Sequence, residues 1–164
     1  MELFRAILQL KIKFLPLLWG MLLFMLSSCN KSRVLYSYYH RIQGEEWHVQ
    51  DERFFSFFVE DTTANYEVKV ALRYKPEITA LDIPIGVIIE TPAGNYLQGE
   101  TSVSLPTRRE LQHQGYHLYQ ADKQLESHWR FQQKGIYTYS LLPLLKDSVI
   151  TGIVELGLIV TKQN

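Results

Sequence analysis

Glu110, His113 and His117 come nearest to a metal-binding pattern in this chain of 164 residues. Histidines four residues apart project from one face of a helix, and a carboxylate three residues before them would complete a set of zinc ligands. Gly115 lies between the two histidines and disfavours the helix that this geometry requires. Histidines of a polar loop are therefore the preferred interpretation, and we expect neither a metal nor a cofactor.

The other residues give little indication that the protein is a catalyst. The Gly-x-Ser-x-Gly pattern of a nucleophile elbow is absent from the sequence. Two carboxylates that meet in space at about 5 to 9 Å could hydrolyse a glycoside. The candidates fall at expected strand ends or turns, where solvated carboxylates are the simpler interpretation: Asp51, Glu60, Asp61, Asp82 and Glu90. We therefore predict a protein that is not an enzyme, with a carbohydrate-active or metal-dependent hydrolase as the alternative.

The only cysteine, Cys29, directly follows the most hydrophobic stretch of the chain. Basic residues precede the uncharged run Phe14–Leu26, whose 13 residues fall short of the ~20 that a membrane-spanning helix needs. This pattern is typical of a cleaved secretory signal. The junction Leu26-Ser27-Ser28-Cys29 resembles the lipobox of bacterial lipoproteins, in which the cysteine is lipidated and becomes the first residue. An ordinary secretory signal or an uncleaved anchor is the alternative.

These features divide the chain into a lipoprotein signal peptide (1–28), a lipidated cysteine with a short tether (29–33) and one folded domain (34–164). Cleavage leaves 14 of the 17 basic and 16 of the 17 acidic side chains. This balance provides no positive field for a nucleic-acid backbone or an anionic bilayer. We therefore expect no nucleic-acid partner, and a membrane attachment that depends on the acyl chains.

Alternation of apolar and polar side chains predicts that the domain is built from strands. Tyr66–Arg73 is the clearest case, with one apolar and one charged face. Phe54–Val59 precedes it, and the turn Asp61–Asn65 predicts that these two segments pair as a hairpin. Gly115 interrupts the helix-like start of Leu105–Asp122, where we expect a loop with at most one or two helical turns.

Three further regions follow the same period of two. Ile83–Ile89 and Tyr96–Leu105 flank the turn Thr91–Asn95, and Trp129–Leu141 alternates on both sides of a turn near Gly135. Apolar residues on both faces of Ile153–Val160 predict a central strand. Short strands separated by turns predict an all-β fold, an antiparallel β-sandwich of the jelly-roll or immunoglobulin-like kind.

The chain also contains ten tyrosines and three tryptophans, more aromatic side chains than we expect in the core alone. Tyrosine offers a large contact area with a polar tip, which suits protein or sugar partners. We predict an interaction surface that includes Tyr96, Tyr116, Tyr119 and Trp129. The alternative is that aromatic residues are simply favoured in strands.

The order of these features resembles the gliding-motility lipoprotein H (GldH) family. The resemblance covers nearly all of the mature chain. It rests on the lipobox cysteine, on Trp47, on Phe57–Thr63 running into Tyr66 and Leu72-Arg73, and on Gly152–Ile159. The sequence departs from the family's loops between Lys75 and Ile83 and between Gln112 and Gln120, so any partner contact made by those loops stays open.

Membership implies a noncatalytic, lipid-anchored accessory of the gliding and associated protein-export machinery. Its partners would be other envelope lipoproteins or motility and secretion proteins. Relatives also occur in bacteria that do not glide, so motility of the host does not follow. Asn30-Lys31-Ser32 after the cysteine lacks the acidic residues of surface-exported lipoproteins and the aspartate of inner-membrane retention, which favours the periplasmic leaflet of the outer membrane.

Two short motifs resemble the O-glycosylation acceptor of bacteria that carry this family. They are Asp61-Thr62-Thr63 and Asp147-Ser148-Val149, which would place glycans on Thr62 and Ser148. Both also fit simple turns, which is the preferred interpretation. A carbohydrate-binding module remains an alternative for the whole domain.

Overall fold

Residues 33–106, 118–144 and 149–163 are the part of the chain that the structure, a computed structural model, describes. The predicted signal peptide lies outside the described residues. Among the candidate site residues, Cys29, Glu110, His113, Tyr116, His117 and Ser148 also lie outside the described residues.

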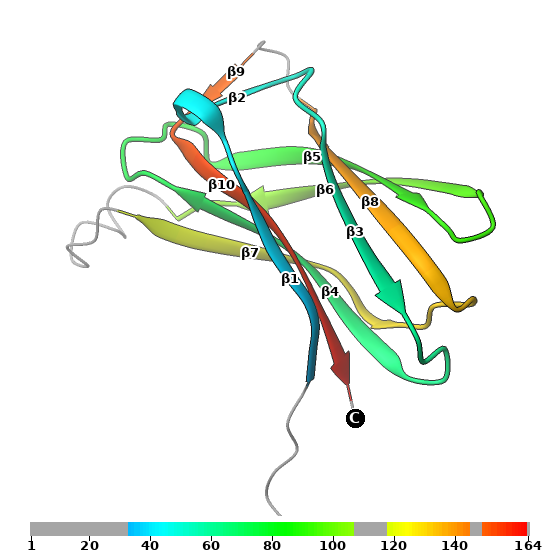
Figure 1. The fold of residues 1–164 in the computed structure, drawn as a ribbon. Helices are drawn as coiled ribbons and strands as arrows, with labels where there is room; N and C mark the ends of the chain where they lie inside the picture. The colour runs from blue at the N-terminus through cyan, green and yellow to red at the C-terminus, as the bar shows by residue number, and fades with distance from the viewer. Residues whose placement is uncertain (1–32, 107–117, 145–148, 164) are drawn as a thin grey trace, which may run out of the picture. The chain divides into compact units, whose positions relative to one another are not determined.

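Two four-stranded antiparallel sheets form the domain (Figure 1). The first sheet has the order β1 (Arg33–Arg41), β10 (Ile153–Gln163), β4 (Asn65–Tyr74) and β7 (Tyr119–Trp129). The second has the order β3 (Arg53–Val59), β8 (Gly135–Pro143), β5 (Asp82–Glu90) and β6 (Tyr96–Ser104). A 3₁₀ turn, η1 (Gln43–Glu45), leads into a small ribbon of β2 (Glu46–His48) and β9 (Val149–Thr151). The predicted β-sandwich is confirmed.

The core lies between the two sheets and consists of their inward-facing apolar side chains. In β4 the alternation seen in the sequence becomes an alternation of burial, with Tyr66, Val68, Val70 and Leu72 at 1% exposure or less. Trp47 fills one end of the sandwich, where its indole N–H donates to the Asp51 carbonyl at 2.9 Å. Because these side chains carry few unpaired polar groups, burial favours folding without a disulfide.

Two predicted features of strand order are confirmed. β5 and β6 form a hairpin in which Asp82 opposes Ser104 and Glu90 opposes Tyr96. β10 is a central strand, since it lies between β1 and β4. The outward face of β10 is partly covered, since Ile159 is half-buried and the Tyr39 ring lies over Gly157.

Two predictions, one about strand pairing and one about a loop, are wrong. β3 does not pair with β4: it pairs with β8, whereas β4 pairs with β10 and β7. The connection between Val59 and Asn65 therefore crosses from one sheet to the other instead of closing a hairpin. Tyr119–Asp122, expected to belong to a loop, is the beginning of β7. In both cases the partner strand comes from a distant part of the sequence.

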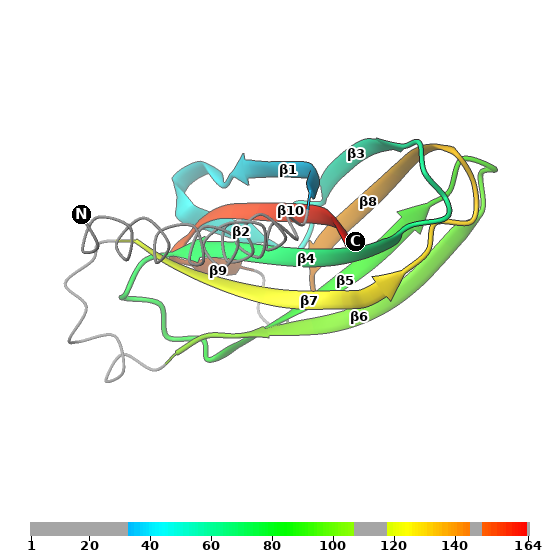
Figure 2. The same ribbon diagram turned by 90° about the horizontal axis from the view of Figure 1, so that it is seen from below.

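The edge strands of the two sheets meet at two seams. Figure 2 shows β1 beside β3 on one side and β7 beside β6 on the other. At the first seam the His40 ring nitrogen Nε2 lies 2.8 Å from the Phe54 carbonyl oxygen, and the His40 ring packs edge-on against Phe55. These contacts cover one edge of β3.

Candidate functional site: an interaction surface on the β1–β10–β4–β7 sheet

The tyrosines and the tryptophan predicted to form one surface occupy different environments. Tyr96 begins β6 and is 63% exposed, and Trp129 ends β7 and is half-buried. Tyr119 is only 9% exposed, because its position opposite Tyr74 directs it toward the core, where the two rings lie 6.1 Å apart. Its assignment to an exposed surface is therefore corrected. An interaction role for Tyr96 and Trp129 stays a prediction.

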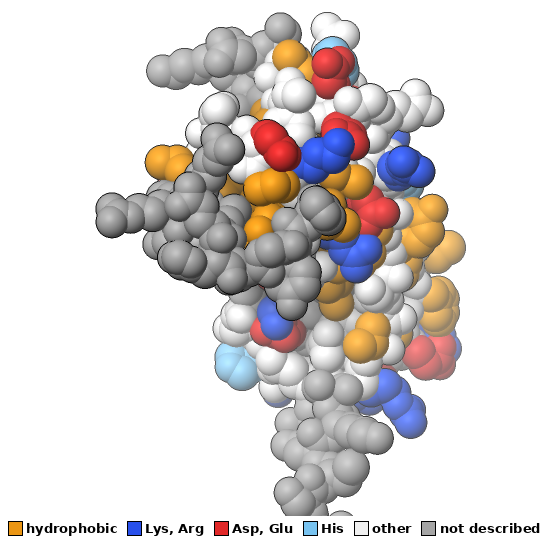
Figure 3. Space-filling model, turned by 90° about the vertical axis from the view of Figure 1, so that its left-hand side faces the viewer, with side chains coloured by type: hydrophobic (Ala, Val, Ile, Leu, Met, Phe, Trp, Pro, Cys, Tyr) orange, Lys and Arg blue, Asp and Glu red, His pale blue; other side chains and the backbone are white. Residues whose placement is uncertain are grey.

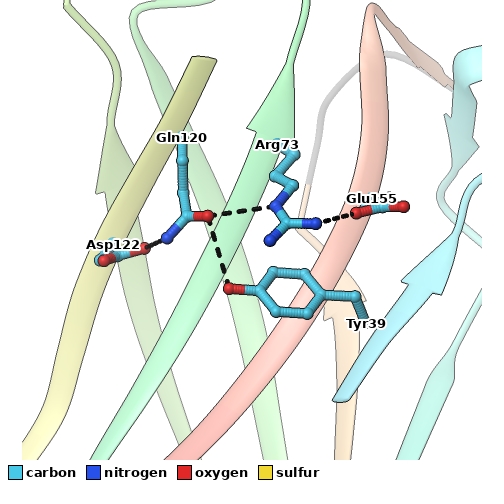
Figure 4. Close-up of polar contacts among 5 residues, drawn as sticks. All are labelled: Tyr39, Arg73, Gln120, Asp122 and Glu155. Carbon is cyan, nitrogen blue, oxygen red and sulfur yellow. Dashed lines mark hydrogen bonds and ion pairs between the residues drawn. The ribbon is translucent and has the colours of Figure 1, made fainter. Parts of the chain in front are cut away.

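An outward-facing polar network crosses the β1–β10–β4–β7 sheet, and nothing in the sequence alone predicted it as a site. Figure 4 shows its five members, contributed by all four strands: Tyr39 (β1), Glu155 (β10), Arg73 (β4), and Gln120 and Asp122 (β7). We call these five residues the Arg73 network. They are separated by as many as 116 positions in the sequence, so only the sheet register brings them together.

Arg73 lies at the centre of this network. Its Nη1 donates to Glu155 Oε2 at 2.7 Å, and its Nε donates to Gln120 Oε1 at 3.1 Å. Gln120 Nε2 in turn donates to Asp122 Oδ1 at 2.9 Å. Arg73, Glu155 and Gln120 are adjacent across the strands, since Arg73 opposes Glu155 on β10 and Gln120 on β7. The charged head of Arg73 is thus held in one orientation by two neighbouring strands.

Gly157 allows Tyr39 to complete the network. Tyr39 opposes Gly157 on the β1–β10 ladder, and a Cβ at Gly157 would lie 2.5 Å from two Tyr39 ring atoms. Without that Cβ the ring lies across β10 and reaches Arg73, whose guanidinium carbon is 4.0 Å from the ring centroid. Burial raises the pKa of the Tyr39 hydroxyl, so this group stays protonated at neutral pH. A glycine inside an apolar strand was the one sequence signal for this close approach.

The Arg73 network has the composition of a recognition surface. Arginine and tyrosine are enriched among the residues that dominate protein interfaces, especially when neighbouring contacts hold them in place. The side chains of Arg73 and Glu155 remain 36% and 27% exposed, so a partner can reach them. On the face that Figure 3 presents, acidic and basic side chains lie beside one another with hydrophobic patches between them. Such a mixed face suits a partner of mixed charge.

Four of the five carboxylates considered for glycoside hydrolysis have local side-chain partners. Asp51 pairs with Arg53, Glu60 with Lys134 and Asp61 with Lys162. Asp82 accepts a hydrogen bond from the Ser104 hydroxyl at 2.7 Å. Within residues 33–106, 118–144 and 149–163, no three acidic, histidine or cysteine side chains are grouped to hold a metal ion. These partners favour structural roles for the four carboxylates.

Asp61 organises the turn that contains the candidate acceptor Thr62. Its Oδ1 accepts hydrogen bonds from the Thr63 amide and hydroxyl at 2.9 and 2.7 Å, and its Oδ2 accepts one from Lys162 at 2.7 Å. The Tyr66 hydroxyl donates to the Asp61 carbonyl. The motif therefore has a structural role in connecting the sheets, and O-glycosylation of Thr62 stays a prediction.

The variant Asp61→Asn should lower the thermal midpoint at neutral pH and weaken its dependence on acid. Lys162 and Thr63 hold the pKa of Asp61 well below its ordinary value of 3.8. The resulting stabilisation is fully present above the pKa of the unfolded chain and is lost as pH falls through the folded-state pKa. Circular dichroism should show the wild-type advantage narrowing below about pH 4. An advantage that does not change with pH would contradict this role, and Glu60→Gln, which alters an exposed ion pair, is the control.

The chain is similar to one protein family and to a few solved structures. A family model described as GldH lipoprotein matches residues 34–160. Dimeric latent PorU from Porphyromonas gingivalis is 8% identical, with a TM-score of 0.36, over 84% of this chain and 14% of that chain. The enzymatically active domain of tailspike protein 4 from bacteriophage CBA120 is 9% identical, with a TM-score of 0.30, over 82% and 18%. This chain thus spans less than a fifth of either. No curated protein matches it.

Proposed function

Since the family match covers more than half of its length, the chain belongs to the GldH lipoprotein family, and we propose that it is a noncatalytic, lipid-anchored component of the cell envelope. It would serve gliding motility or the associated protein-export machinery by binding another envelope protein. The periplasmic leaflet of the outer membrane is the proposed location.

Chain connectivity supports an anchor close to the folded domain. Cys29 precedes the first residue of β1, Arg33, by four positions, which limits the separation of their Cα atoms to about 14 Å. Acyl chains on Cys29 would therefore keep the sandwich near the bilayer surface. Among the described residues, none forms a helix long and apolar enough to cross a membrane.

The main support for a binding role is that the Arg73 network and Gly157 lie together on one sheet face. Three of these residues, Arg73, Glu155 and Gly157, belong to two of the segments on which the resemblance to the family rests. These segments meet on one outward sheet face, where Arg73 pairs with Glu155 and contacts the ring of Tyr39 from β1. The contacts of Arg73 with Glu155 and Tyr39 hold these hydrogen-bonding groups in place. A partner can recognise groups that are held in place, so the network favours binding over turnover of a substrate.

A photo-crosslinking experiment tests this proposal. Gln124 is exposed beside the network and opposes Lys69, so a photoreactive amino acid at this position should capture a partner that binds the face. We expect mass spectrometry to identify a motility or secretion component in the crosslinked product. Arg73→Ala should reduce the yield at least about tenfold, because truncating a hot-spot residue, a class in which arginine is enriched, costs about 2 kcal/mol or more.

Two controls make the result specific. Arg73→Lys keeps the charge but loses the planar contacts, so it should restore only part of the yield. The same photoreactive group at Phe54, which is 57% exposed on the other sheet, should give products that do not depend on Arg73. Crosslinks from position 124 that persist in Arg73→Ala, or that contain only abundant unrelated envelope proteins, would refute the binding role.

A further inference from the structure

Exposed apolar side chains gather at the end of the sandwich where β1 begins. Val34 and Leu35, the first apolar residues of β1, are 58% and 38% exposed. Phe58 near the end of β3 is 49% exposed, and Ile136, directly opposite it on β8, is 60% exposed. We call these four residues the end patch. Scattered exposed apolar side chains need no explanation, whereas a group of them indicates a contact surface.

A series of contacts connects the beginning of β1 with the end of β3. Arg33, the first residue of β1, opposes Lys162 of β10. The Lys162 amine donates to Asp61 Oδ2 at 2.7 Å, and Asp61 comes three residues after Phe58. Figure 1 shows the end of β3 on the same side of the sandwich as the beginning of β1. The residues of the end patch therefore share one end of the domain.

Basic side chains accompany the end patch. Lys134 Nζ lies 5.9 Å from the centre of the Phe58 ring and pairs with Glu60. Arg130 donates a hydrogen bond of 2.8 Å to the first residue of β4, which opposes the last residue of β10. No ion pair within the described part of the chain includes Arg33 or Arg130. Apolar side chains beside unpaired cations are typical of surfaces that meet lipid headgroups.

The tether determines which surface lies within reach of the end patch. The Cα atoms of Cys29 and Arg33 are at most about 14 Å apart. Acyl chains on Cys29 would therefore hold this end of the sandwich beside the bilayer. We propose that the end patch contacts the bilayer and that Phe58 and Ile136 enter its headgroup region. This placement depends on the lipid anchor of the proposed function.

The same placement directs the Arg73 network away from the lipid. Glu155 comes seven residues before Lys162 in β10, so about 23 Å separates these two residues along the strand. One end of the sheet then meets the bilayer, and the other presents the network to an envelope protein. A second copy on the end patch fits less well, because it would separate the patch from the bilayer that anchors both copies.

Fluorescence quenching in vesicles tests this placement. The lipidated mature protein is reconstituted in phosphatidylethanolamine and phosphatidylglycerol. Cys29 is the only cysteine, and its acylated sulfur does not react with a thiol-specific dye, so Phe58→Cys and Ile136→Cys each accept one label. A lipid with a nitroxide on its headgroup should quench both labels at least about twice as strongly as a label at Phe54→Cys, because apolar groups at a membrane surface enter it by ~5–10 Å.

Phe54 is the matched position. It is 57% exposed in the same strand as Phe58, but it lies about 13 Å farther from the end of the sandwich. A second substitution distinguishes contact of the patch from simple proximity. Phe58→Asp should reduce lipid quenching of a label at Ile136→Cys at least about twofold, since a charge disfavours entry into the headgroup region. Phe54→Asp should leave that quenching unchanged.

The outcomes separate the anchor from the placement. Protein that does not float with the vesicles in a density gradient would refute the anchor and, with it, the placement. Protein that floats but shows equal quenching at positions 54, 58 and 136 would refute the placement alone. So would a label at position 136 that ignores Phe58→Asp. Labels shielded from aqueous iodide but not quenched by the lipid would indicate a second copy on the end patch, which also overturns the proposal.

Discussion

Replacing Phe131 by alanine should reduce the free energy of unfolding by about 3–5 kcal/mol. Phe131 is 1% exposed and lies in the connection between β7 and β8. Its ring centroid lies 5.1 Å from that of Tyr66 in one sheet and 4.6 Å from that of Tyr137 in the other. The side chain thus joins the two layers of the sandwich.

The expected loss has two sources. Removal of the ring leaves a cavity among side chains that cannot all move to fill it, and it also removes edge-on contacts with Phe57 and Trp129. Urea unfolding of the mature protein, followed by tyrosine and tryptophan fluorescence, measures the change. Phe58→Ala is the matched control because Phe58 is 49% exposed, and it should cost less than about 1 kcal/mol. A similar small loss for Phe131→Ala would show that this ring does not join the sheets.

The substitution Cys29→Ala should abolish incorporation of radiolabelled palmitate and release the protein from the membrane fraction. Each buried methylene contributes ~0.8 kcal/mol, so two or three acyl chains make attachment effectively permanent, and their loss is an all-or-none change. The 14 basic and 16 acidic side chains of the mature chain offer no electrostatic substitute for the anchor. Washing the membranes with high salt or carbonate before electrophoresis distinguishes an acyl anchor from adsorption.

A variant at the neighbouring position provides the control. Asn30→Ala keeps the thiol and should label like the wild type. Equal labelling of wild type and Cys29→Ala, or retention of Cys29→Ala on carbonate-washed membranes, would refute the anchor. Protease added to intact cells tests the proposed leaflet: a protein on the periplasmic side should survive until the outer membrane is opened.

Local pairing of β5 and β6 could be predicted because the information lies in neighbouring residues. The turn Thr91–Asn95 is short, and it brings Ile89 opposite Leu97 and Ile83 opposite Val103. The central position of β10 was also visible, since a strand buried on both faces needs apolar residues on both. Both features therefore depend on residues that lie close together in the sequence.

The pairing of β3 could not be predicted in the same way. The connection from Glu60 to Ala64 has the composition of a turn whether it closes a hairpin or crosses the ~10 Å between packed sheets. The choice depends on β8, about 80 residues later, whose backbone groups pair with those of β3. Likewise, the sequence marked Tyr119 as aromatic, but only its register opposite Tyr74 turned it inward.

The amino-acid sequence alone determined the strand-forming segments, the position of Cys29 after an apolar leader and the resemblance to a lipoprotein family, because periodicity and short motifs are local properties. Only the tertiary structure decided which outward side chains share a face. Tyr39, Arg73 and Glu155 meet because antiparallel register places them on adjacent strands and Gly157 lets the Tyr39 ring lie across β10. The same kind of long-range register places Phe58 opposite Ile136. Long-range pairing reflects the burial of the whole core, so no single segment contains it.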